Sequence, residues 1–301
     1  MKRLIIIIIT IIFCYSSIAF SATFEEIKFY ADQGLAEAQY NLGVMYVRGL
    51  GVRQDYKKAI ELYKKAADQG LVEAQVNLGF MYEKGLGVRQ DYQKAKELYE
   101  KAAEQGFAGG QAYLGFMYAR GLGVQQDYQK AKELYEKAAE QGFAEAQVDL
   151  GVMYEQGLGV RQDYQKAKEL YEKAAEQGFA GAQKNLGVMY EQGLGVRQDY
   201  QKAKELYEKA AEQGFAGAQV NLGFMYARGL GVRQDYQKAK ELYEKAAEQG
   251  VAEAQLNLGV MYEQGLGVRQ NLAIAKEWFG RACDNGNQRG CNHYARLNSS
   301  Y

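Results

Sequence analysis

The sequence predicts an all-α protein built as a solenoid of seven 36-residue helix-turn-helix repeats. Two observations carry this prediction. The chain repeats without gaps, and its units begin at Gln33, Gln69, Gln105, Gln141, Gln177, Gln213 and Gln249. Each unit contains two amphipathic helical patterns separated by glycines, which at this period is typical of an α-solenoid. An apolar share of 48% with 13% aromatic residues also excludes a disordered chain.

The N-terminal segment has the three-part layout of a secretory signal peptide, predicted over residues 1–21. Lys2 and Arg3 are basic, Leu4–Phe13 is almost entirely apolar, and small or polar residues follow. The apolar run is about half of the roughly 20 residues that a membrane-spanning helix needs. We therefore expect an exported mature chain without a transmembrane segment, located in the periplasm or secreted.

The sequence leaves the processing of this segment open. Cleavage after Ala19 and cleavage after Ser21 both satisfy the preference for small residues. Lipidation of Cys14 is a weaker alternative, because the bulky Phe13 stands where that processing site favours a small residue.

The second repeat illustrates the two predicted helices. Helix A is expected over Val72–Lys84, and Gly85 and Gly87 end it because glycine readily adopts a positive φ. Asp91 is placed to cap the following helix B, whose apolar stripe includes Tyr99. The repeats are expected over residues 33–284.

Both ends of a solenoid need a cap, because a terminal repeat would otherwise expose its apolar face. Residues 22–32 include a segment like a lone helix B, Phe24–Asp32, which predicts the N-terminal cap. Residues 285–301 are expected to form the C-terminal cap and tail, with a last helix from Asn285 to about Leu297.

The repeated pattern A-x-x-x-L-G-x-x-Y-x-x-G-x-G-V-x-x-D-Y-x-K-A-x-x-x-Y-x-x-A-A-x-x-G resembles the Sel-one-like repeat, a relative of the tetratricopeptide repeat. The resemblance covers Gln33–Asp284, with one departure: the loop G-V-R-Q-D lacks the proline that the family often has before glutamine. It implies a right-handed superhelix whose helix A layer lines the concave side and binds proteins.

Cys283 and Cys291 lie near the predicted junction of two antiparallel helices, within reach of a disulfide. A disulfide suits an exported protein, and the resemblance to cysteine-rich family members supports it. A redox or metal-binding pair is the alternative, although the spacing is not C-x-x-C and His293 is the one further soft ligand nearby. We expect His293 to be a surface or cap residue.

The composition argues against most enzymatic and nucleic-acid functions. Of 37 basic residues two lie in the leader, so the remaining 35 face 37 acidic ones, without the basic excess typical of nucleic-acid binders. No Ser or Thr occurs between Phe24 and Leu297, and a single His disfavours a zinc site. We predict no catalytic, metal or cofactor site. Carboxylate catalysis of the glycosidase type stays open, and some cysteine-rich relatives are described as β-lactam-binding or β-lactam-hydrolysing.

The repeats differ from one another mainly on helix A, whereas helix B is identical in the second to sixth units. The variable positions are spaced by three and four residues, so they share one helical face. This predicts a binding face that comprises Tyr40, Asn41, Arg48, Asn77, Phe80, Lys84, Tyr113, Phe116, Arg120, Asp149, Lys184, Asn185, Asn221, Phe224, Arg228 and Asn257. Drift after recent duplication, or volume changes in the core, would also produce such differences.

The predicted function is therefore that of an exported, non-enzymatic scaffold that binds a protein or extended peptide. The asparagines are expected to hydrogen-bond a peptide backbone while the aromatic residues anchor it, so their replacement by alanine is expected to remove binding without changing stability. Peptidoglycan or a host surface protein is a further candidate partner, and a cell-wall-associated or β-lactam-binding protein is the alternative function.

Overall fold

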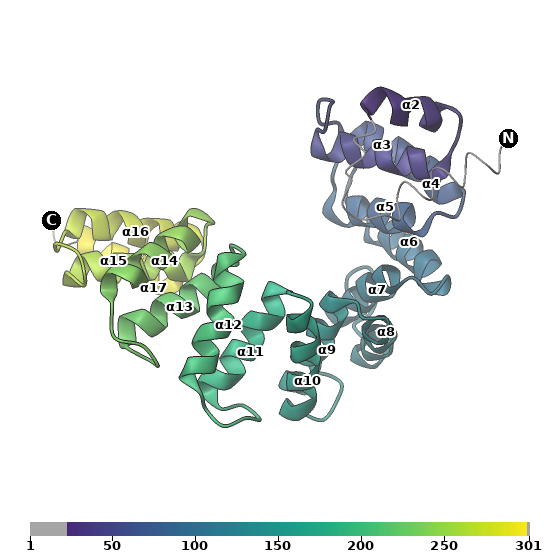
Figure 1. Ribbon diagram of the computed structural model, residues 1–301. Helices are drawn as coiled ribbons and strands as arrows, with labels where there is room; N and C mark the ends of the chain where they lie inside the picture. Colours follow the sequence, from purple (N-terminus) through teal and green to yellow (C-terminus); the bar gives the residue numbers. More distant parts are fainter. Residues whose placement is uncertain (1–22, 300–301) are drawn as a thin grey trace. The chain divides into compact units, whose positions relative to one another are not determined.

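The structure is a computed structural model that describes residues 23–299. Sixteen helices, α2–α17, occupy this range, and it contains no strand (Figure 1). The predicted all-α repeat fold is confirmed. The predicted signal peptide lies outside the described residues. Within residues 23–299, none of the helices has the length and apolar content that crossing a lipid bilayer requires.

The helices form two compact units that meet in sequence between Asp127 and Tyr128, inside the third repeat. The first contains α2 (Phe24–Asp32), α3 (Ala36–Arg48), α4 (Tyr56–Asp68), α5 (Val72–Lys84), α6 (Tyr92–Glu104) and α7 (Ala108–Arg120). The second contains α8 (Tyr128–Glu140), α9 (Ala144–Gln156), α10 (Tyr164–Glu176), α11 (Ala180–Gln192), α12 (Tyr200–Glu212), α13 (Ala216–Arg228), α14 (Tyr236–Glu248), α15 (Ala252–Gln264), α16 (Leu272–Asp284) and α17 (Gln288–Asn298). The handedness of the superhelix and the concave position of helix A remain predictions.

Local sequence signals set the bounds of each helix. In the second repeat, helix A is α5 and has the predicted bounds, Val72–Lys84. Gly85 follows it with φ +69°, a left-handed conformation that ends the helix. The Asp91 carboxylate accepts a hydrogen bond from the Lys94 backbone N–H at 3.1 Å, which caps helix B, α6.

Within each unit, an aromatic residue of helix B, a tyrosine or Phe279, packs on a glycine of helix A in the core of a repeat. Tyr99 is fully buried, and a Cβ added at Gly79 would stand 2.7 Å from its Cε1 atom. Glycine is therefore required here for close approach of the ring. The same contact occurs between Gly187 and Tyr207, and small buried residues such as Ala95 and Ala102 complete the interface.

Within each unit, pairs of glutamines join a helix A to the turn that follows the next helix B. Gln105 donates from Nε2 to the Oε1 atom of buried Gln75 at 3.0 Å, and Gln213 donates likewise to Gln183 at 2.9 Å. At the C-terminal end, Asn285 takes the donor's place and bonds Gln255 at 2.9 Å. Glutamine recurs at both the donor and the acceptor position along the repeats. This recurrence is visible in the sequence, but no role was predicted for these glutamines.

Both predicted capping helices are present. The first, α2, has the predicted bounds, and a reciprocal capping box between Thr23 and Glu26 begins it. The last, α17, begins at Gln288 rather than Asn285, because the Asn287 side chain caps it by accepting from the Gly290 N–H at 3.0 Å. Leu297 of α17 is buried in a cluster with Leu256 and Phe279, so α17 covers the end of the core.

Candidate functional site

The sixteen residues of the predicted binding face all lie on helix A of a repeat, nine in the first unit and seven in the second. We call this set the helix A face. Its exposed members are Arg48, Phe80, Lys84, Arg120, Phe224 and Arg228. Its half-buried members are Tyr40, Asn41, Asn77, Tyr113, Phe116, Asp149, Lys184, Asn185, Asn221 and Asn257.

Three helices of this face carry a phenylalanine paired with a cation one turn later. On α5 the Lys84 Nζ atom lies 5.6 Å from the ring centre of Phe80. On α7 and α13, the guanidinium carbons of Arg120 and Arg228 each lie 5.7 Å from the Phe116 and Phe224 rings. These distances are those of cation–π contacts. Phe80 and Phe224 remain 37% and 41% exposed, so they are not core residues.

The remaining repeats lack this pair. Valine and glutamine replace it on α9, α11 and α15, and α3 combines Val44 with Arg48. In the first unit, α5 and α7 contact each other, and both helices carry the pair. In the second unit, α13 carries the pair between two helices that have valine and glutamine.

Some asparagines of the face lie at contacts between repeats, and their proposed role in binding a peptide stays a prediction. Asn77 donates from Nδ2 to the Tyr40 hydroxyl at 3.4 Å. Asn185 and Asn221 lie beside the hydroxyls of Tyr171 and Tyr207, the tyrosines of the preceding helix B. Because Asn77 bridges two repeats, its replacement by alanine is expected to lower stability, contrary to the sequence-based prediction.

At the position that asparagine occupies in most repeats, two residues with aromatic rings instead stack on a ring of the preceding helix B. Tyr113 stacks on Tyr99 with ring centres 5.2 Å apart and an interplanar angle of 17°. In the C-terminal cap, His293 stacks on Phe279 at 4.6 Å and 23°. The variation in this column therefore preserves packing against the aromatic ring of the helix B before it.

The helix B tyrosines also fix carboxylates on helix A. The hydroxyl of Tyr99 donates to Glu83 at 2.9 Å, and the hydroxyl of Tyr207 donates to Glu191 at 2.6 Å. Burial raises the pKa of both tyrosines far above the usual value, and the neighbouring glutamates raise it further. Each tyrosine thus stays protonated as a donor, and these carboxylates serve to hold adjacent helices together.

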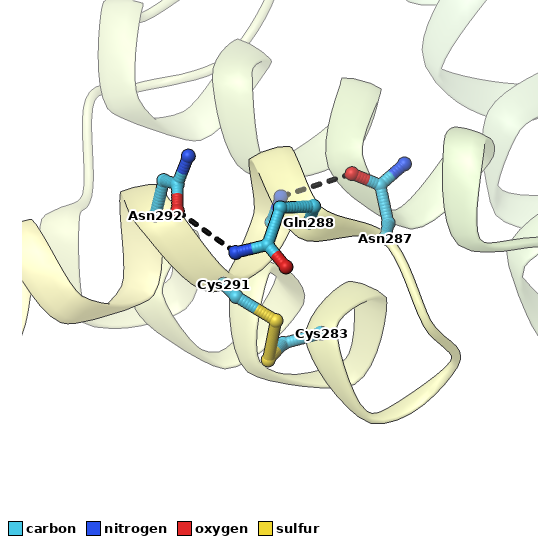
Figure 2. Close-up of a disulfide and its surroundings, with 6 residues drawn as sticks. Cys283, Asn287, Gln288, Cys291 and Asn292 are labelled. Carbon is cyan, nitrogen blue, oxygen red and sulfur yellow. Dashed lines mark hydrogen bonds between the residues drawn. A yellow bond between two sulfur atoms is a disulfide. The ribbon is translucent and has the colours of Figure 1, made fainter.

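The predicted disulfide is present and joins the end of α16 to the first turn of α17 (Figure 2). Figure 2 shows the Cys283–Cys291 bond beside the cap of α17, where Gln288 donates to Asn292 at 3.1 Å. Both sulfur atoms are used in this bond, so they do not serve as metal ligands in this state. Among residues 23–299 no group of three or more metal-ligating side chains is found.

His293 lies in the C-terminal cap, as expected. Its Nδ1 atom is 3.5 Å from a carboxylate oxygen of Glu263, and the Arg296 guanidinium bonds the other oxygen of Glu263. This carboxylate and the stacked ring of Phe279 give His293 a role in attaching α17 to the last repeat.

A family model decides the identity of the repeats. The Sel1 repeat model matches seven consecutive segments, residues 36–71, 72–107, 108–143, 144–179, 180–215, 216–251 and 252–287. The chain belongs to the Sel1 repeat family. Sel1 repeat proteins are generally scaffolds for protein–protein interaction, and their fold is typically non-catalytic. A comparison with curated protein sequences found no match.

Solved structures of similar chains support this assignment. One is c5321, a protective antigen of uropathogenic Escherichia coli with an SLR fold, at 39% identity and a TM-score of 0.69. The alignment covers 92% of this Sel1 repeat chain and 59% of c5321, so the chain spans less than two thirds of that relative. A Sel1 repeat protein from Oxalobacter formigenes is 36% identical over 91% of this chain and 79% of its own, with a TM-score of 0.67.

A further neighbour is the immunity protein Pa5087 from Pseudomonas aeruginosa. It is 25% identical over 73% of this Sel1 repeat chain and 82% of its own, with a TM-score of 0.53.

Proposed function

We propose that this Sel1 repeat protein is an exported, non-catalytic scaffold that binds an extended segment of a partner protein along the helix A face. The observation that carries the proposal is the set of exposed phenylalanines on α5 and α13, each beside a cation. Aromatic residues, phenylalanine among them, and arginines are enriched at protein–protein interfaces.

Repeats with the phenylalanine–cation pair and repeats with valine and glutamine would contribute differently to the recognition of a partner. Helix B is identical in the second to sixth repeats, and the glutamine pairs recur along the chain, so the scaffold stays the same while the helix A face varies. An aromatic anchor of the partner would dock where Phe80 or Phe224 stands, and an acidic or carbonyl group would meet the neighbouring cation. Repeats with valine and glutamine offer a smaller, uncharged surface at the same positions.

The chain itself supplies the test of this face. The variant Phe224→Val with Arg228→Gln converts the sixth repeat to the combination found at Val188 and Gln192. Because that combination already occurs in a folded repeat, stability should change little. The partner segment would first be identified by a photo-reactive residue at position 224, then synthesised as a peptide. We expect its affinity for the variant to fall about tenfold or more in calorimetry.

The matched control is Phe215→Leu with Lys209→Gln. It also removes one exposed phenylalanine and one cation, but away from the helix A face, and the first two repeats have Leu35 and Leu71 at the position of Phe215. Unchanged affinity of the Phe224→Val/Arg228→Gln variant, or equal loss in the control, would contradict the proposal.

Export is tested separately by fusing residues 1–30 to a reporter that is active only outside the cytoplasm. We expect reporter activity, and a mature chain that begins after Ala19 or Ser21. The change Ile8→Asp interrupts the apolar run and is expected to abolish export. A cytoplasmic, unprocessed fusion would exclude the exported location.

A further inference from the structure

Open pockets of the second unit lie at the loops that join helix A to helix B, and no residue of the helix A face lines them. The pocket of the fourth repeat is formed by α8, by the end of α9 and by the loop that leads into α10. Its lining includes Gln129 and Lys132 from α8, Tyr154 from α9, and Arg161 and Lys166 from the following segment.

The loop is held firmly against the previous repeat. The Gln129 side chain donates from Nε2 to the Gly159 carbonyl oxygen at 2.5 Å. In the sixth repeat, a Cβ added at the equivalent Gly231 would stand 2.6 Å from the Cβ atom of Tyr200. Each loop therefore rests on the first turn of the preceding helix B, and the pocket is a built feature of the junction between repeats.

The pocket has an excess of positive charge. Lys132, Arg161 and Lys166 line it, and the one acidic lining residue is Asp163. The Asp163 carboxylate accepts hydrogen bonds from the N–H groups of Gln165 and Lys166, both at 3.1 Å, so it is committed to capping α10.

Arg161 is the cation most available to a ligand. Lys132 pairs with Glu136 at 2.7 Å, and the Lys166 Nζ atom lies 5.0 Å from the ring centre of Tyr154. Arg161 is exposed, and no ion pair found in the described residues engages it.

The same pocket recurs along the unit. In the sixth repeat it is lined by Lys204, Tyr226, Arg233 and Lys238, each 72 residues after its counterpart in the fourth. The fifth repeat has the same residue types at Lys168, Tyr190, Arg197 and Lys202. Identical sites at regular intervals suit a ligand made of identical units, which a folded partner protein is not.

We propose that this row of pockets binds an acidic polysaccharide, with one anionic group at each arginine. The cations would meet carboxylate or sulfate groups, and the side-chain oxygen of Gln129 and the hydroxyl of Tyr154 would bond sugar hydroxyls. Nucleic acid fits less well, because binding single strands relies on open aromatic faces and Lys166 covers the face of Tyr154. This inference concerns a surface separate from the helix A face.

The experiment measures binding of the mature chain to immobilised polygalacturonate and heparin, with neutral dextran and single-stranded DNA of similar length for comparison. We expect binding to one or both acidic polysaccharides that weakens as salt rises, with none to dextran and less to DNA. The triple variant Arg161→Gln/Arg197→Gln/Arg233→Gln introduces the residue that the third repeat has at Gln125, so it should fold. Its affinity should fall about tenfold or more.

The control is the triple variant Lys173→Gln/Lys209→Gln/Lys245→Gln, which changes the net charge equally at exposed helix B positions outside these pockets. It is expected to retain nearly full binding, as is the Phe224→Val/Arg228→Gln variant of the helix A face. Equal weakening in both triple variants, tighter binding to DNA, or no binding to either acidic polysaccharide would overturn the proposal.

Discussion

Replacing Gly187 by alanine is expected to destabilise the second unit, although alanine is the better helix former. In an open helix the change would gain about 1 kcal/mol. Here the new Cβ atom would stand 2.5 Å from Cε1 of Tyr207, a side chain that is fully buried and cannot move aside. Overpacking of this kind costs about 1–3 kcal/mol or more, and we expect this cost to exceed the gain in propensity because the ring has no room to shift.

The measurement is thermal unfolding by circular dichroism together with hydrogen exchange in α11 and α12. Because each repeat contacts its neighbours, the loss should be strongest in these helices and weaker farther along the unit. The control is Gly181→Ala in the same helix, where the equivalent position of the fourth repeat holds Glu145 after the same phenylalanine. A melting temperature of Gly187→Ala equal to or above that of Gly181→Ala would refute the packing argument.

Removing the disulfide with Cys283→Ser and Cys291→Ser is expected to loosen α17. By the loop-closure model, a bridge spanning eight residues contributes about 2.5 kcal/mol. The remaining attachments of α17 include the buried side chain of Leu297, the contacts of His293 and Arg296 with the last repeat, and the hydrogen bond from Lys276 to Asn298. We expect α17 to open locally before the rest of the second unit unfolds.

Hydrogen exchange measured by mass spectrometry checks this result. Amides of α17 should exchange much faster in the double variant, and those of α9–α12 should be unchanged. The wild-type chain treated with a reductant provides an independent comparison that carries no substitution. If α17 exchanges at the wild-type rate in both cases, the disulfide does not hold the cap in place.

Much of the fold could be predicted because each repeat contains its own start and stop signals. The bounds of α5 followed from the apolar spacing and from Gly85, and Asp91 acted as the predicted cap. Averaging over seven near-identical copies removed the usual ambiguity of a single helix end. The C-terminal cap was less certain because it is not repeated, and Asn287 begins α17 later than predicted.

The candidate site was predicted less well, because helical spacing shows which residues share a face but not which of them already have partners. Phe80 and Phe224 are exposed, as a binding role requires. Asn185 and Asn221 lie on the same face, but beside the hydroxyls of tyrosines from the preceding repeat. Such a partner lies fourteen residues away on another helix, beyond the reach of a pattern within one helix.

The identical helix B sequences of the second to sixth repeats favour recombination between copies within the gene. Recombination between two copies would remove or add whole 36-residue modules in frame, and each new junction would again place a tyrosine on a glycine. The number of repeats can therefore change by one at a time, and no new type of contact between helices is needed. Selection on the number and order of Phe-bearing and Val-bearing modules could then alter the ligand while the scaffold stays constant.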